Sequence, residues 1–141
     1  MKLKKQLQVY FTGTIIGVIF AVIGFSYNAW RLEVTEDNNN IRVASFTVLK
    51  ELAELEQLIY AGHYDKNTVE GSPRRGWIKV GLIVDLSSLI NHAVRDEAVS
   101  LKSSWQTNWQ SFTDDKKATD MLVVNIDAVR AELKSTLDAL E

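Results

Sequence analysis

Cysteine is absent from the 141-residue sequence, proline occurs once, and glycine occurs only seven times. The absence of cysteine excludes a disulfide scaffold, a zinc–thiolate site and a thiol nucleophile. The scarcity of proline and glycine argues against a collagen-like or loop-rich chain. The length suits a single domain whose stability comes from a hydrophobic core rather than from covalent cross-links.

Charge is absent from the segment between Lys5 and Arg31, whose most apolar part runs from Val9 to Phe25. With aromatic residues near both ends, this segment approaches the length that crosses the hydrocarbon core of a membrane. A cleaved signal peptide is the alternative interpretation, and residues 24–26 form its one passable cleavage site. The apolar run is longer than the usual core of a signal peptide, which favours a retained transmembrane anchor.

Three lysines before residue 6 set the predicted orientation, because no acidic residue precedes Glu33. Basic residues next to a span tend to remain in the cytoplasm. We therefore predict a cytoplasmic tail over residues 1–8, a transmembrane helix over residues 9–30, and an extracytoplasmic domain over residues 31–141. In a bacterium, this is a single-pass protein of the inner (cell) membrane with a periplasmic C-terminal domain.

Small residues recur every four positions within the predicted span, at Gly13, Gly17 and Ala21. Such a stripe lies on one face of a helix and lets a second helix approach closely. Glycine is also common in transmembrane helices in general, which is the plainer interpretation. We interpret the stripe as a packing face for another membrane protein or for a second copy of the chain in a homodimer.

Helical spacing dominates the sequence after residue 31, and no alternating strand pattern is sustained. Positions three and four apart form a seam typical of a bundle at Ile41, Ser45, Val48, Leu52, Leu55 and Ile59. Residues 35–40 are poor helix formers, so we expect a weak point or a new N-cap there. Gly62 is expected to end this helix in the left-handed conformation, and residues 63–76 to form the one long loop.

The next helical pattern covers residues 77–112 and permits either one helix or two. A break near residues 91–97, with Asp96 as an N-cap, would give two shorter helices. The last helix is marked by regularly spaced apolar residues after residue 121, and residues 113–115 supply its caps. The predicted fold class is therefore all-α, with an N-terminal transmembrane helix and an antiparallel bundle of three long or four shorter helices.

The charge and the motifs exclude several function classes. Residues 31–141 contain 13 basic and 18 acidic residues, a net charge of −5, which is a poor match for the phosphates of nucleic acid. No Ser-His-Asp set, glycine-rich phosphate loop or plausible pair of catalytic carboxylates occurs, so we expect neither an enzyme nor a cofactor. His63, Asp65 and Glu70 offer too few ligands at consistent spacing to predict a metal site.

Four residues are candidates for contact with a partner or ligand. Arg74 and Arg75 form a basic spot on the acidic domain, and the planar guanidinium group binds carboxylates and phosphates. Trp77 and Trp109 carry large aromatic groups, and an exposed Trp109 would mark a binding surface. Solvated loop arginines and core tryptophans are the alternative interpretations.

These features favour a non-enzymatic, membrane-anchored accessory or assembly protein. Its predicted partners are the lipid bilayer and another membrane protein, or a second copy of itself. The alternative is a periplasmic ligand-sensing module that binds a small anionic molecule near Arg74 and Arg75. The plan resembles small bacterial inner-membrane accessory proteins and the periplasmic half of helical-bundle chemoreceptors, in architecture only.

Overall fold

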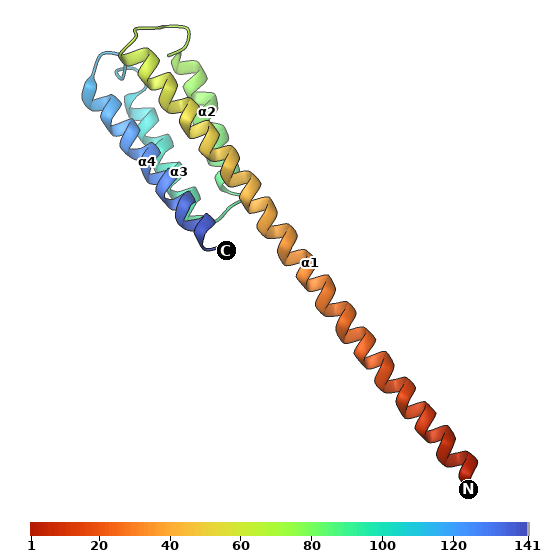
Figure 1. Ribbon diagram of the computed structural model, residues 1–141. Helices are drawn as coiled ribbons and strands as arrows, with labels where there is room; N and C mark the ends of the chain where they lie inside the picture. The colour runs from red at the N-terminus through yellow and green to blue at the C-terminus, as the bar shows by residue number, and fades with distance from the viewer. Residues whose placement is uncertain (141) are drawn as a thin grey trace. The chain divides into compact units, whose positions relative to one another are not determined.

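The computed structural model describes residues 1–140, and within them the chain forms four α-helices and no strands. The helices are α1 (Lys2–His63), α2 (Pro73–Ser87), α3 (His92–Asn108) and α4 (Lys116–Asp138), as Figure 1 shows. The chain divides into two compact units, Met1–Asn39 and Asn40–Glu141. The all-α prediction is confirmed, and of the two helix counts left open, the larger one is correct.

Helix α1 continues through residues 35–40, where the sequence analysis expected a weak point or a new N-cap. The expectation of an N-cap was wrong. Each Asn, Thr or Asp in a helix costs less than about 1 kcal/mol relative to alanine, and strong helix formers lie on both sides. The hydroxyl group of Thr35 donates to the carbonyl of Arg31 at 2.8 Å, so it is satisfied inside the helix rather than as a cap.

The core of the second unit lies where the C-terminal part of α1 meets α2, α3 and α4. The predicted seam of α1 is buried, with Val48, Leu52, Leu55 and Ile59 fully inaccessible to solvent. The other helices contribute a matching set of inaccessible residues at Val80, Ile83, Val94, Leu101, Trp105, Leu122, Ile126, Val129 and Leu133. The three-and-four spacing read from the sequence therefore marks the faces that form one continuous core.

A four-residue connection separates α2 from α3, a few residues earlier than the break that the sequence predicted. Asn91, not Asp96, is the N-cap of α3, and its side-chain oxygen accepts a hydrogen bond from the backbone N–H of Val94 at 2.8 Å. The amide group of Asn91 also donates to the hydroxyl of Thr136 at 2.9 Å. Asn91 therefore caps a free backbone N–H group at the start of α3 and also bonds the connection to α4. Asp96 lies inside α3, where it cannot cap the helix.

Two expectations about the end of α1 also need correction. Gly62 lies inside the helix, and the residue with a positive φ angle is Lys66, at 52°. The connection from α1 to α2 covers residues 64–72 rather than 63–76, because α2 begins at Pro73. Proline favours the first helical position, where its fixed φ suits the helix and its missing N–H costs nothing.

Candidate functional site

Two connections, residues 64–72 and residues 109–115, meet at one end of the bundle. The carbonyl oxygen of Phe112 lies 2.7 Å from Nδ1 of His63 and accepts a hydrogen bond from the hydroxyl of Thr119, also at 2.7 Å. Because a carbonyl only accepts, Nδ1 of His63 must carry the hydrogen. The end of α1 is thereby joined to the start of α4 through a single backbone group.

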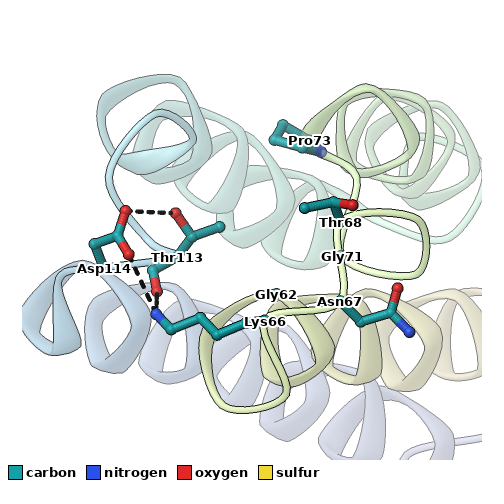
Figure 2. A pocket seen from close by; sticks show the side chains of 8 residues that line it. All are labelled: Gly62, Lys66, Asn67, Thr68, Gly71, Pro73, Thr113 and Asp114. Atoms are coloured by element: carbon teal, nitrogen blue, oxygen red, sulfur yellow. Dashed lines mark hydrogen bonds and ion pairs between the residues drawn. The ribbon is translucent and has the colours of Figure 1, made fainter.

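Lys66 makes a second link between the same two connections (Figure 2). Its ammonium group donates to the carbonyl of Thr113 and to Oδ1 of Asp114, the latter at 3.2 Å. This hydrogen bond and the lysine charge hold the pKa of Asp114 below its usual value. Lys66 has a left-handed backbone, and the N–H of the next residue, Asn67, donates to the carbonyl of Ala61 at 3.0 Å, which closes the end of α1.

A pocket of about 280 Å³ lies beside this link and is shown in Figure 2. Its lining residues come from both connections and from the adjacent helix ends: Gly62, Lys66, Asn67, Thr68, Gly71, Pro73, Thr113 and Asp114. The side-chain oxygen of Asn67 accepts from the backbone N–H groups of Val69 and Glu70, each at 3.0 Å. The surface of the pocket is mainly apolar, and its lysine is already paired with the carboxylate of Asp114, so its chemistry does not favour an anion.

Glycines let the backbone pack closely at this end. A Cβ atom on Gly71 would overlap the backbone of Gly62, and a Cβ on Gly62 would lie 2.8 Å from the ring of Phe112. Gly62 is thus important for close packing rather than for a left-handed cap. At this end of the bundle, the backbone of the 64–72 connection contacts the backbone of α1 directly.

The candidate residues Arg74 and Arg75 lie in the first turn of α2 and not in a loop. Both are exposed, and a guanidinium nitrogen of Arg75 lies 3.5 Å from the carbonyl oxygen of Val69. Helix N-termini and arginines both favour negative charge, so this location is compatible with the predicted anionic ligand. Binding of an anion at this location stays a prediction.

The candidate residues Trp77 and Trp109 are brought together, one from α2 and one at the end of α3. Their ring centroids are 6.3 Å apart with an interplanar angle of 66°, which is an edge-to-face arrangement. Both side chains are half-buried, whereas Trp105, one turn before Trp109, is completely buried. The structure therefore separates a core tryptophan from a pair that reaches the surface.

The residues of the small-residue stripe belong to the first unit. Gly13, Gly17 and Ala21 are all exposed. A Cβ atom built on Gly13 or Gly17 would have no neighbour within 4 Å outside its own helix turn. The stripe is thus open to contact along its length, and helix packing at this stripe stays a prediction.

An ion-pair cluster that was not predicted from the sequence lies between α1 and α2. The ammonium group of Lys79 lies 3.0 Å from Glu51 and also contacts Glu54, and its side chain is only 15% exposed. Burial alone would lower the pKa of Lys79, but its hydrogen bonds and charge interactions with the two carboxylates together outweigh burial, so the pKa of Lys79 is raised. The hydrogen bond from Lys79 likewise lowers the pKa of Glu54. Lys79 is 28 residues from Glu51 and 25 residues from Glu54, so no short sequence pattern predicts that these side chains pair.

Replacing Lys79 with methionine is expected to lower the free energy of unfolding at pH 7 by about 1–2 kcal/mol, because Glu51 loses its partner while nearly buried. The lowered pKa of Glu54 means that its contribution is present at neutral pH and is lost as the pH falls below its ordinary value of 4.5. The raised pKa of Lys79 means that its contribution is lost only as the pH rises above 10.5.

Chemical denaturation of wild type and Lys79→Met across pH 3–8 checks this expectation. The difference between the two proteins should shrink in acid, because protonated carboxyl groups no longer need the lysine. The matched control is Lys50→Met, which removes an exposed lysine whose contact with Glu54 is 3.7 Å and should change little. A difference that is constant with pH would contradict the proposed role of the charges.

Among residues 1–140, no group of three His, Asp or Glu side chains comes together in a way that could hold a metal ion. His63, Asp65 and Glu70, which the sequence analysis considered as ligands, do not form such a group. The chain shows no significant similarity to any protein-family model, curated protein or solved structure with which it was compared.

Proposed function

We propose that the chain is a membrane-anchored accessory protein that acts through helix contacts with a membrane-protein partner. The observation that supports this most strongly is the exposure of the apolar part of the first unit. One helix is long and apolar enough to cross a membrane, and none of its most apolar window is buried. Phe11, Phe20 and Phe25 are 69%, 70% and 76% exposed.

Exposing these side chains to water is costly. Burying one large apolar side chain is worth about 1.5–3 kcal/mol, and the segment contains many of them. A bilayer supplies the missing apolar environment along the whole helix surface, whereas a soluble partner would cover only one side. The lysines at positions 2, 4 and 5 then favour a cytoplasmic N-terminus and an extracytoplasmic bundle in a bacterial inner membrane.

Two surfaces support contact with a partner. Within the anchor, Gly13, Gly17 and Ala21 allow close approach of a second helix. On the bundle, the half-buried pair of Trp77 and Trp109 offers the aromatic surface that is enriched at binding hot spots.

The test is purification of the full-length protein from its native membrane in mild detergent, with Gly17→Leu as the disrupting variant. The matched control is Ser26→Leu, which adds the same side chain on the opposite face of the same helix. We expect a different membrane protein to co-purify in fixed ratio with wild type and with Ser26→Leu, and to be lost with Gly17→Leu. Resistance of the chain to alkaline extraction of the membranes tests the anchor separately.

Recovery of the chain without any other protein would reject the accessory role. Release of the chain by alkaline extraction would reject the anchor. If a partner is retained equally by both variants, the small-residue stripe is not the contact. Trp109→Ala then tests whether the bundle provides the contact.

A further inference from the structure

A second, smaller pocket lies where α1, the 64–72 connection and the start of α2 meet. Its volume is about 180 Å³, and its lining residues come from all three segments: Glu54, Gln57, Leu58, Glu70, Arg75 and Lys79. It shares no lining residue with the pocket beside Lys66. Four of its six lining side chains are charged, two with each sign, so it can offer contacts to both an anionic and a cationic group.

Two of these four charges are already satisfied by the protein. The ammonium group of Lys79 donates to Glu54 and also to Glu51, the latter at 3.0 Å, and its side chain is only 15% exposed. Leu58, on the same side of the pocket, is buried. These side chains are held by the contact between α1 and α2, so they form a fixed wall that needs no ligand to complete it.

The other two charges, Glu70 and Arg75, are not satisfied in this way. Within residues 1–140, the carboxylate of Glu70 takes part in no ion pair and no side-chain hydrogen bond. The guanidinium group of Arg75 reaches only the carbonyl oxygen of Val69, at 3.5 Å, which is long for a hydrogen bond. Because Val69 directly precedes Glu70, this contact places the guanidinium beside the segment that carries Glu70. Two opposite charges therefore line one pocket without pairing with each other.

This arrangement suits a small ligand that carries both charges. A guanidinium group binds a carboxylate through two parallel N–H···O bonds, and a carboxylate accepts hydrogen bonds from an ammonium group. A simple anion would attract Arg75 but would be repelled by Glu70, and a simple cation would be repelled by Arg75. The volume of about 180 Å³ has room for about six water molecules, which is the size of a small amino acid.

We propose that this pocket binds a small zwitterion of the α-amino acid class, with its carboxylate on Arg75 and its ammonium group on Glu70. The amide group of Gln57 can donate to the first or accept from the second, and Leu58 offers an apolar contact for a short side chain. Both charged side chains are exposed, so we expect a dissociation constant of about 1 mM. This inference goes beyond the proposed contact with a membrane partner and does not depend on it.

The experiment is an NMR titration of the nitrogen-15-labelled full-length protein in detergent micelles. The probes are glycine, L-alanine, L-serine and L-valine, each added up to about 50 mM, well above the expected dissociation constant. We expect the amide signals of Glu70 and Arg75 to shift until they saturate. For the probe that binds, the matched acid without the ammonium group and the matched amine without the carboxylate should bind about tenfold more weakly or less. For L-valine, these two analogues are isovalerate and isobutylamine.

Variants of the two charged residues locate the binding site. Arg75→Gln and Glu70→Gln should each weaken binding about tenfold or more, because each removes one half of the charge recognition. The matched controls are Arg74→Gln and Asp65→Asn, which remove the same kinds of charge from exposed positions outside the pocket and should leave binding unchanged. All the altered side chains are exposed, so the fold should be unaffected, and circular dichroism of each variant checks this.

Three results would overturn the proposal. One is the absence of a saturable shift with every amino acid in the set. Another is an acid or amine analogue that binds as tightly as its parent amino acid, because the pocket would then recognise only one charge. The third is binding that persists unchanged in both Arg75→Gln and Glu70→Gln, because the ligand would then occupy a different part of the protein.

Discussion

Replacing Trp105 with alanine is expected to lower the free energy of unfolding of the bundle by about 3–5 kcal/mol, the usual cost of removing a large aromatic side chain from a core. Trp105 is completely buried, and the centroid of its ring lies 5.5 Å from the ring centroid of Phe112. Its indole nitrogen has no hydrogen-bond partner among the described residues, so its contribution comes from packing.

Chemical denaturation of the full-length protein in mild detergent, followed by circular dichroism, measures this loss. The matched control is Trp109→Ala, which removes the same side chain one turn later from a half-buried position. We expect Trp109→Ala to cost clearly less than Trp105→Ala. Equal costs for the two variants would mean that Trp105 is not the centre of the core at this end.

Replacing Gly76 with alanine is expected to cost about 2 kcal/mol or more, although alanine is the better helix former. A Cβ atom at this position would overlap the benzene part of the Trp105 indole, and that ring is itself fixed by its neighbours. Steric overlap in a packed core forces side chains off their preferred rotamers or shifts the backbone. Helix α2 therefore needs glycine where it crosses Trp105.

Gly81, in the same helix, is the matched control because a Cβ atom there would meet nothing within 4 Å. Gly81→Ala is expected to stabilise the protein by up to about 1 kcal/mol through helix propensity alone. A second check combines Gly76→Ala with Trp105→Leu. If the overlap is with Trp105, Gly76→Ala should cost less in that background. The same loss in both backgrounds would point to a different cause.

The helical faces could be predicted because burial follows a local period. The spacing of Val48, Leu52, Leu55 and Ile59 identifies the buried face of α1 without knowledge of what covers it. The limits of helices were harder to predict, because side chains compete to form the cap. Asn91 gains a contact with Thr136 on α4, and nothing near it in the sequence indicates that advantage.

The candidate sites were predictable only where one residue type is informative by itself. Tryptophan and arginine are enriched at binding surfaces, so these residues could be selected by type alone. The structure brings two of them, Trp77 and Trp109, together. The link from Lys66 to Thr113 and Asp114 depends on two connections that meet only in the folded chain.

The backbone contact between Gly62 and Gly71 has a consequence for how this sequence can change over evolutionary time. A side chain at Gly71 would overlap the backbone of Gly62, and a side chain at Gly62 would overlap the ring of Phe112. Gly76 is constrained in the same way by Trp105. Substitutions at these sites must therefore be accompanied by changes elsewhere, whereas surface positions can change independently. A distant relative whose overall similarity has faded should still carry glycines at these positions and an aromatic residue opposite the last of them.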